Sequence, residues 1–301
     1  MTDGSPWEWL VFLTGQQPLT MTWLPVLAFA CLIGCGVELS AGRPLSRLLP
    51  TSWTSVRTDL WLWLAGRLFG LIQGLGLPVL TLALASEWLG DPNGPSPGVL
   101  AWVLLGTVHL LFTDFVSWVL HWARHRIDVL WAFHVVHHSA TYLQPFTTFR
   151  RHPFEAHVLV YLLNTVGSLP LVGIVWLYPG VDPLRLTVFA VVQTVFLLTY
   201  ANLLHSMVWL SFGPVVENWL VSPAMHQIHH SRKEDECMSN YGQIFSIWDR
   251  LFGTLIRAHQ VPFETLELGV DGVEHDTLWQ VFVSPVLSSA RALRGWVRGP
   301  A

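Results

Sequence analysis

The sequence predicts an all-α protein, in which a bundle of four to five membrane-spanning helices carries a histidine-rich cap. Three properties of the 301-residue chain lead to this prediction. Charged residues make up 12% of the chain, about half of the ~25% typical of soluble domains. Apolar residues make up 52%, and histidine occurs 14 times. So few charges exclude a disordered chain, and the net charge of −4 gives no reason to expect nucleic-acid binding.

The helices are located in order by stretches that lack Asp, Glu, Lys and Arg. A helix needs about 20 apolar residues to cross a bilayer core. Trimmed at turn residues, the stretches predict spans near 14–37, 60–86, 99–121, 157–178 and 185–207. Helix-breaking residues at 74–78 and 167–170 interrupt the second and fourth spans, so the expected number is four to five.

The arginines indicate how these spans are oriented. They gather after spans one, three and five, whereas the opposite loops are poor in basic residues. Because basic loops stay on the cytoplasmic side, we expect residues 122–155, and everything after about 208, to be cytoplasmic. The start of the chain carries Asp3 and Glu8 before its first apolar run, which is unlike a signal peptide. The predicted protein is therefore a multi-pass membrane protein.

Eight of the histidines form three clusters on segments expected at the cytoplasmic side. Spacings of three and four place side chains on one helix face, where imidazoles can share a metal ion. Eight nitrogen donors exceed the four of a structural zinc site, which favours two metal ions. A further histidine, His205, ends span five at the same side. The clusters are His121 and His125; His134, His137 and His138; and His226, His229 and His230.

Around these clusters the chain resembles the superfamily of fatty acid hydroxylases and sterol desaturases, which are integral-membrane, non-haem di-iron oxygenases. The matching motifs lie, in order, between Asp114 and Thr254. They include the three clusters, Arg151-His152-Pro153-Phe154-Glu155, His205-Ser206 and Trp248-Asp249-Arg250. The resemblance implies that nine histidines bind two irons: His121, His125, His134, His137, His138, His205, His226, His229 and His230.

Two further residues are candidates for the site. Asp114 lies seven residues before His121, on the same helix face, and a buried carboxylate needs a partner. We expect it to hold a ligand histidine, with Arg124 or a helix end as the alternative. Some relatives place another histidine where this chain has Ala201, so His152 is either an extra ligand or a residue of the substrate pocket. His109, mid-span, is expected to face a neighbouring helix, and His259 and His275 to lie at a surface or interface.

The resemblance implies oxygen-dependent hydroxylation of an unactivated C–H bond in a lipid-like substrate, such as a fatty acyl chain, a sterol or an isoprenoid. Desaturation or oxidative cleavage at the same site is the alternative. Imidazole itself also suits zinc, copper and nickel, so a zinc-binding membrane transporter is a remote third possibility. It is disfavoured because the predicted spans contain almost no polar residues besides Asp114 and His109. The chain has no nucleotide-binding or iron–sulfur motif, so a separate electron-donor protein is expected.

These features divide the chain into three parts. Residues 1–98 are expected to form N-terminal membrane helices, 99–258 a di-iron hydroxylase domain, and 259–301 a C-terminal segment. Within the last part, 277–298 mixes apolar residues with Arg291, Arg294 and Arg298. This pattern favours an amphipathic segment on the inner membrane surface.

Overall fold

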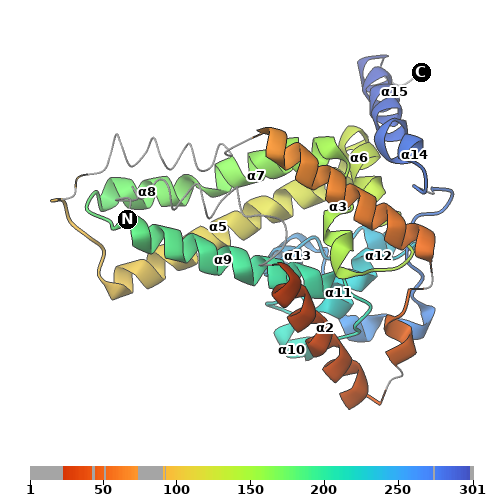
Figure 1. The fold of residues 1–301 in the computed structure, drawn as a ribbon, viewed down its shortest axis with the longest axis horizontal. Helices are drawn as coiled ribbons and strands as arrows, with labels where there is room; N and C mark the ends of the chain where they lie inside the picture. The colour runs from red at the N-terminus through yellow and green to blue at the C-terminus, as the bar shows by residue number, and fades with distance from the viewer. Residues whose placement is uncertain are drawn as a thin grey trace.

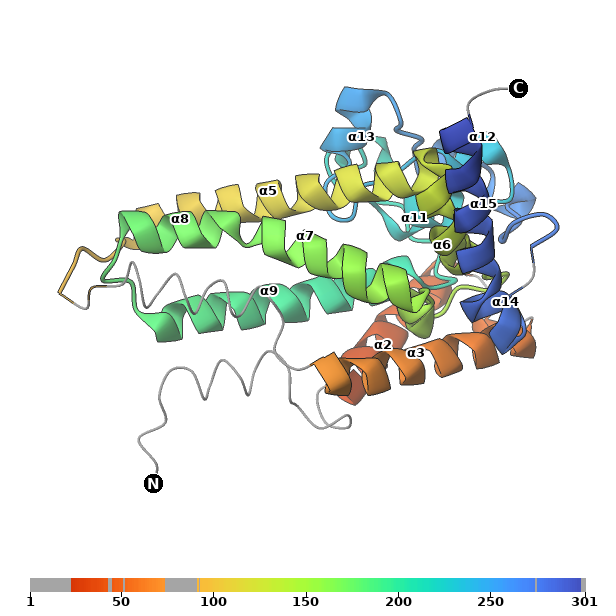
Figure 2. The same ribbon diagram turned by 90° about the horizontal axis from the view of Figure 1, so that it is seen from above.

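The computed structural model describes residues 23–42, 45–50, 52–73, 91, 93–273 and 275–298. Throughout these ranges the regular elements are helices, and pairing between extended segments is limited to isolated bridges. The predicted all-α class is therefore confirmed. Long helices run side by side away from a compact group of short ones, which we call the cap (Figures 1 and 2). The cap contains α6 and the short helices from α10 to α13.

The longest helix, α5 (Val99–Arg126), links the long helices to the cap. Its 28 residues extend about 42 Å at 1.5 Å per residue. Among the described residues, it is the one helix that is both long and apolar enough to cross a membrane. It lies beside α7 (Val160–Gly167) and α8 (Leu169–Leu177), with α9 (Pro183–Leu204) close by (Figure 2). Residues 14–22 and 74–86 of the first two predicted spans lie outside the described residues.

The fourth predicted span is interrupted where the sequence suggested. A π-helical turn (Glu155–Leu159) leads into α7, and Ser168 separates α7 from α8. At Gly167 the backbone comes so close to α5 that an added Cβ would lie 3.0 Å from Thr113 Cγ2. The Thr113 hydroxyl donates to the Gly167 carbonyl at 3.1 Å. The break therefore allows close packing against α5.

The cap consists of short elements that begin and end at clear local signals. Helix α6 (Asp128–His138) follows α5 after the extended residue Ile127. Helix α11 (Pro223–His229) starts with proline in its first turn, and the Ser222 hydroxyl accepts from the Met225 amide at 3.2 Å. The remaining cap helices are α10 (Gly213–Val216), α12 (Glu234–Cys237) and α13 (Ile247–Phe252).

Helices from the N-terminal and C-terminal parts of the chain pack around the cap. The C-terminal helices α14 (Leu278–Phe282) and α15 (Ser284–Arg298) follow one another end to end, and α15 packs on α6 (Figure 2). Its apolar Leu293 and Trp296 stay exposed, and their contact with a membrane remains a prediction. Further elements are α2 (Trp23–Ser40), η1 (Leu45–Leu48), α3 (Trp53–Gln73), η2 (Pro145–Phe149), η4 (Ala258–Gln260) and η5 (Phe263–Thr265).

Candidate metal centre

The cap brings nine histidines together in two adjacent groups. Within each group the potential ligand atoms all lie within 4.8 Å of one another. The side chains come from the end of α5, from α6, from the residue after α9 and from α11, so distant parts of the chain converge here. One group contains His121, His125, His134, His138 and His229, and the other contains His137, His205, His226 and His230.

Backbone carbonyls fix four of these rings through their Nδ1 atoms. The acceptors are the carbonyls of Tyr241 for His121 (2.9 Å), Arg150 for His137 (3.2 Å), Ala201 for His205 (2.8 Å) and Ser239 for His229 (2.7 Å). A carbonyl only accepts, so each Nδ1 must carry the hydrogen. The Nε2 atoms of the four rings then point toward the interior of the two groups.

The resulting arrangement of Nε2 atoms calls for a cation. Burial lowers the pKa of His229 to about 3 and the pKa of His137 well below its ordinary value, so both rings are neutral. A neutral ring with hydrogen on Nδ1 has only a lone pair on Nε2. Yet His229 Nε2 lies 3.0 Å from His121 Nε2, and His205 Nε2 lies 3.1 Å from His137 Nε2. Two facing lone pairs repel each other unless a metal ion binds both, so the donor set fits metal ions.

Further buried nitrogen atoms of the site have no hydrogen-bond partner among the described residues. They are Nε2 of His125, His134 and His138, Nδ1 of His226, and both ring nitrogens of His230. Leaving a buried polar atom unsatisfied costs about 1–3 kcal/mol, so a protein seldom accumulates several. Metal binding would satisfy the ring nitrogens that face the interior of each group.

Glu155 is the carboxylate that contacts a ligand-type histidine. It is fully buried, and its Oε1 accepts from His134 Nδ1 at 2.9 Å and from the Arg124 guanidinium. Although burial opposes ionisation, the adjacent His134 and Arg124 hold the pKa of Glu155 well below its ordinary value. A carboxylate on the far nitrogen of a metal-binding histidine orients the ring and raises its basicity. The sequence predicted Asp114 in this position, although Glu155 ends the motif Arg151-His152-Pro153-Phe154-Glu155.

Asp114 does not contact a histidine, contrary to expectation. Its oxygens accept from the Ile244 amide (2.9 Å), the Phe245 amide (3.1 Å) and Trp248 Nε1 (2.9 Å). Seven residues of helix separate it from His121, which is about 10 Å of rise, too far for a direct hydrogen bond. Asp114 therefore fixes the segment before α13 onto α5.

Asp249 supports the site from α13 itself. It accepts from Trp118 Nε1 and the Tyr241 amide, both at 2.9 Å, and from the Gly242 amide at 2.8 Å. Since the Tyr241 carbonyl accepts from His121, Asp249 positions His121 through one residue of backbone. An added Cβ at Gly242 would lie 2.6 Å from the Phe245 carbonyl, so only glycine fits in this turn.

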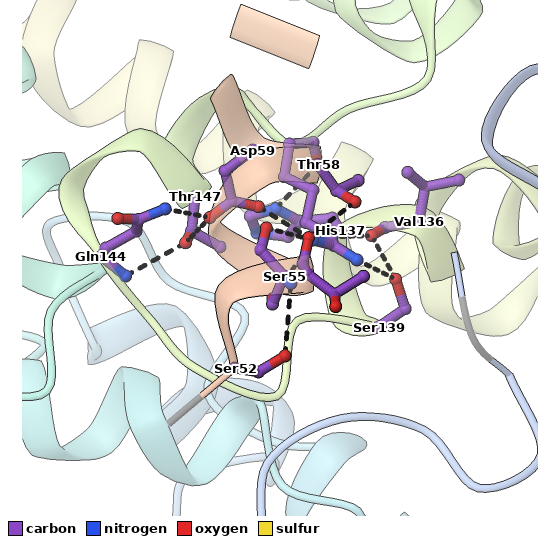
Figure 3. Close-up of polar contacts among 11 residues, drawn as sticks. Ser52, Ser55, Thr58, Asp59, Val136, His137, Ser139, Gln144 and Thr147 are labelled. Carbon is purple, nitrogen blue, oxygen red and sulfur yellow. Dashed lines mark hydrogen bonds and ion pairs between the residues drawn. The ribbon is translucent and has the colours of Figure 1, made fainter. Parts of the chain in front are cut away.

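Arg150 connects the site to α3. Its guanidinium donates to Asp59 (2.9 Å), to the Val136 carbonyl (2.9 Å) and to the Ser139 hydroxyl (3.0 Å). Asp59 also accepts from Thr147 (2.6 Å), as Figure 3 shows among the surrounding polar residues. Because the Arg150 carbonyl holds His137, this buried network positions a residue of the second group. Asp59 was not singled out from the sequence, since a lone acidic residue in an apolar helix carries no motif.

The other histidines lie outside both groups. His152 uses Nδ1 to accept from the Phe154 amide (3.1 Å), and its Nε2 lies 3.1 Å from the Phe282 carbonyl. His109 pairs with Gln193 on α9 at 3.0 Å, which confirms that it faces a neighbouring helix. His259 is exposed, as expected. His275 is instead buried, with 4% of its surface exposed.

A cavity of about 440 Å³ borders the candidate metal centre, although none of the nine grouped histidines forms part of its wall. It follows α5 from Leu110 to Arg124, which is about 21 Å of helix. Its wall includes two residues linked to grouped histidines: the Ala201 carbonyl holds His205, and Arg124 pairs with Glu155, the partner of His134. Most of its wall is apolar, so it suits a long apolar ligand with one end near the candidate metal centre.

Comparison with known proteins finds relatives of the part of the chain that contains these histidines. A profile of the fatty acid hydroxylase family matches residues 106–254. The chain is 31% identical over 177 residues to a delta(7)-sterol 5(6)-desaturase of Gibberella zeae, covering 58% of this chain and 44% of the relative. It is 30% identical over 219 residues to an alkylglycerol monooxygenase of Danio rerio, covering 66% and 45% respectively. It is 31% identical over 171 residues to the ornithine lipid hydroxylase OlsE of Rhizobium tropici, covering 56% and 46%.

The chain thus spans less than half the length of these relatives. No solved structure matches it. The matched segment nevertheless contains all nine grouped histidines together with Glu155 and Asp249. The chain belongs to the superfamily of fatty acid hydroxylases and sterol desaturases.

Proposed function

We propose that the protein is a membrane-bound, di-iron, O₂-dependent oxygenase that hydroxylates an unactivated C–H bond of a lipid-like substrate. The observation that carries the proposal is the pair of histidine groups with facing Nε2 lone pairs. The relatives support it, since they are a desaturase, a monooxygenase and a hydroxylase.

The nine grouped histidines are the proposed iron ligands. One iron would be held among His121, His125, His134, His138 and His229, and the other among His137, His205, His226 and His230. His152 is not included, because backbone groups lie within hydrogen-bond distance of both its nitrogens. Bound iron would supply the O₂ activation that amino-acid side chains cannot provide.

The protein itself positions ligands and excludes water. Glu155 holds His134, and backbone carbonyls hold His121, His137, His205 and His229 with Nε2 directed inward. The apolar cavity would orient the substrate chain along α5, with its reacting carbon at the Arg124 end. A substrate bound in this way would displace water from this end of the cavity.

Desaturation or oxidative cleavage on the same site is the alternative outcome, since one of the relatives is named a desaturase. We further propose that a separate electron-donor protein docks on the cap, and that the cap faces the cytoplasm. A zinc-binding transporter is the remaining alternative. Metal analysis of the purified protein separates it from the oxygenase.

Two measurements test the proposal. Elemental analysis of purified protein should find two irons per chain, and stoichiometric zinc without iron would contradict an oxygenase. Mass spectrometry of lipids from cells with and without the protein should then reveal a lipid that gains one oxygen atom. A lipid that loses two hydrogens would instead indicate desaturation. The control is a His229→Ala protein, which should give the same lipid profile as cells that lack the protein.

A further inference from the structure

Arg151 presents a cation to the substrate cavity, and the nearby carboxylate that acts on its charge, Glu155, is bonded to Arg124 and His134 and not to Arg151. Its Nε is buried and lacks a hydrogen-bond partner, and within the described residues its guanidinium forms no ion pair. Its neighbour Arg150 is the opposite case, because contacts with Asp59, Val136 and Ser139 occupy its donors. Two consecutive arginines therefore serve different purposes, and only Arg151 has donors to spare.

The charges at this end of the cavity do not balance. Arg124 and Arg151 contribute two positive charges to the wall, and Glu155, which pairs with Arg124, contributes one negative charge. Asp114, the acidic residue that does line the wall, is ten residues from Arg124 along α5, which corresponds to about 15 Å. Its oxygens are already occupied by two amides and Trp248. One positive charge is therefore left at the end of the cavity next to the histidines.

We propose that Arg151 binds an oxyanion, a phosphate or a carboxylate, at the head of the lipid substrate. The planar guanidinium presents donors in a geometry that matches both groups. The apolar remainder of the cavity would take the chain attached to that anion, which extends along α5 toward Leu110. This inference rests on the proposed function, because it identifies the cavity as the substrate site.

The test compares ligands that differ only in the head group. Full-length protein as purified, in neutral maltoside micelles, is titrated with hexadecyl phosphate, palmitate and hexadecan-1-ol, and binding is followed by native mass spectrometry. A charge-assisted contact should make at least one of the anionic lipids bind about tenfold or more tightly than the alcohol. Equal binding of all three by the wild-type protein would overturn the proposal.

Variants assign the preference to Arg151. In Arg151→Gln the preference for anionic lipid should fall below about threefold, whereas in Arg294→Gln, which alters an exposed arginine of α15, it should be unchanged. A folded Arg151→Gln protein that keeps the full preference would refute the assignment. If the Gln variant fails to fold, Arg151→Lys decides, because lysine lacks the bidentate geometry. A loss of threefold or more is then expected, and no loss overturns the proposal.

Inorganic phosphate distinguishes a lipid head group from a free anion. Phosphate alone should compete with hexadecyl phosphate only weakly, because it lacks the chain that the apolar wall would bind. Equal affinity for the two would make this a site for free anions and would refute the lipid assignment. Since the assay measures lipid binding and not turnover, its failure in protein that contains iron and is active would leave the proposed function intact. Absence of iron in the native protein would refute that function alone.

Discussion

Replacing Glu155 tests whether a buried carboxylate tunes the candidate metal centre. In Glu155→Gln the amide oxygen can still accept from His134, but the negative charge is lost. Arg124, whose side chain is only 10% exposed, then has no counter-charge. Removing one partner of a buried ion pair typically costs about 3–5 kcal/mol of unfolding free energy. Loss of a group that holds a metal-binding histidine typically weakens metal binding by about 10–100-fold.

The two effects can be separated. We expect Glu155→Gln to weaken metal binding by about 10-fold and Glu155→Ala by about 100-fold, because alanine also removes the acceptor for His134. The double variant Glu155→Gln, Arg124→Met removes both charges and should recover much of the stability but not the metal affinity. Iron retained against a graded chelator series measures affinity, and thermal unfolding measures stability.

Glu264→Gln, which alters an exposed carboxylate of η5, is the matched control and should change neither quantity. If Glu155→Ala retained iron as tightly as the wild type, Glu155 would have no influence on the candidate metal centre. If Glu155→Gln were as stable as the wild type, the ion pair with Arg124 would not contribute as the structure suggests.

Three further predictions follow from the same contacts. His205→Ala should lose the iron of the second group and all activity, as measured by metal analysis and product formation, whereas His259→Ala should retain both. Full iron content in His205→Ala would show that His205 is not a ligand. Metal-free protein should lose stability as the pH falls below 6.5. Burial lowers the pKa of His229 from 6.5 to about 3 in the folded protein, so the unfolded chain binds more protons, which costs about 1.4 kcal/mol of unfolding free energy per pH unit for each such histidine. A flat stability profile by chemical denaturation from pH 7 to 5 would contradict this. Asp59→Asn should lower the free energy of unfolding by about 3–5 kcal/mol, because it leaves Arg150 without its counter-ion. An unchanged free energy of unfolding in chemical denaturation would show that the ion pair does not stabilise the fold.

The sequence could show which histidines belong to the site, because helical spacings of three and four are local information. It could not show how they divide: His134 and His138, four residues apart, lie in one group, whereas His137 lies in the other. His205 stands alone in the sequence, and only the return of α9 to the cap brings it beside His137. The all-α class and the break near Ser168 could also be read from apolar runs and helix breakers.

The carboxylates were harder to assign, because their partners are distant in sequence. Asp114 shares a helix face with His121, and this alone suggested contact, but its oxygens meet amides about 130 residues away. Glu155 reaches His134 from the turn before α7, which depends on how that turn packs against α6. Helical spacing predicts neighbours on one helix, whereas these contacts form between helices.

The pairing of Asp59 with Arg150 bears on where an autonomous fragment of this protein could begin. The segment shared with the fatty acid hydroxylase family starts at residue 106, but the counter-ion of Arg150 lies on α3, well before it. A fragment beginning at residue 99 would carry a guanidinium that is only 1% exposed in the full chain, without the carboxylate that neutralises it. Expression and crystallisation efforts should therefore start upstream of Trp53, so that α3 stays with the histidines it helps to place.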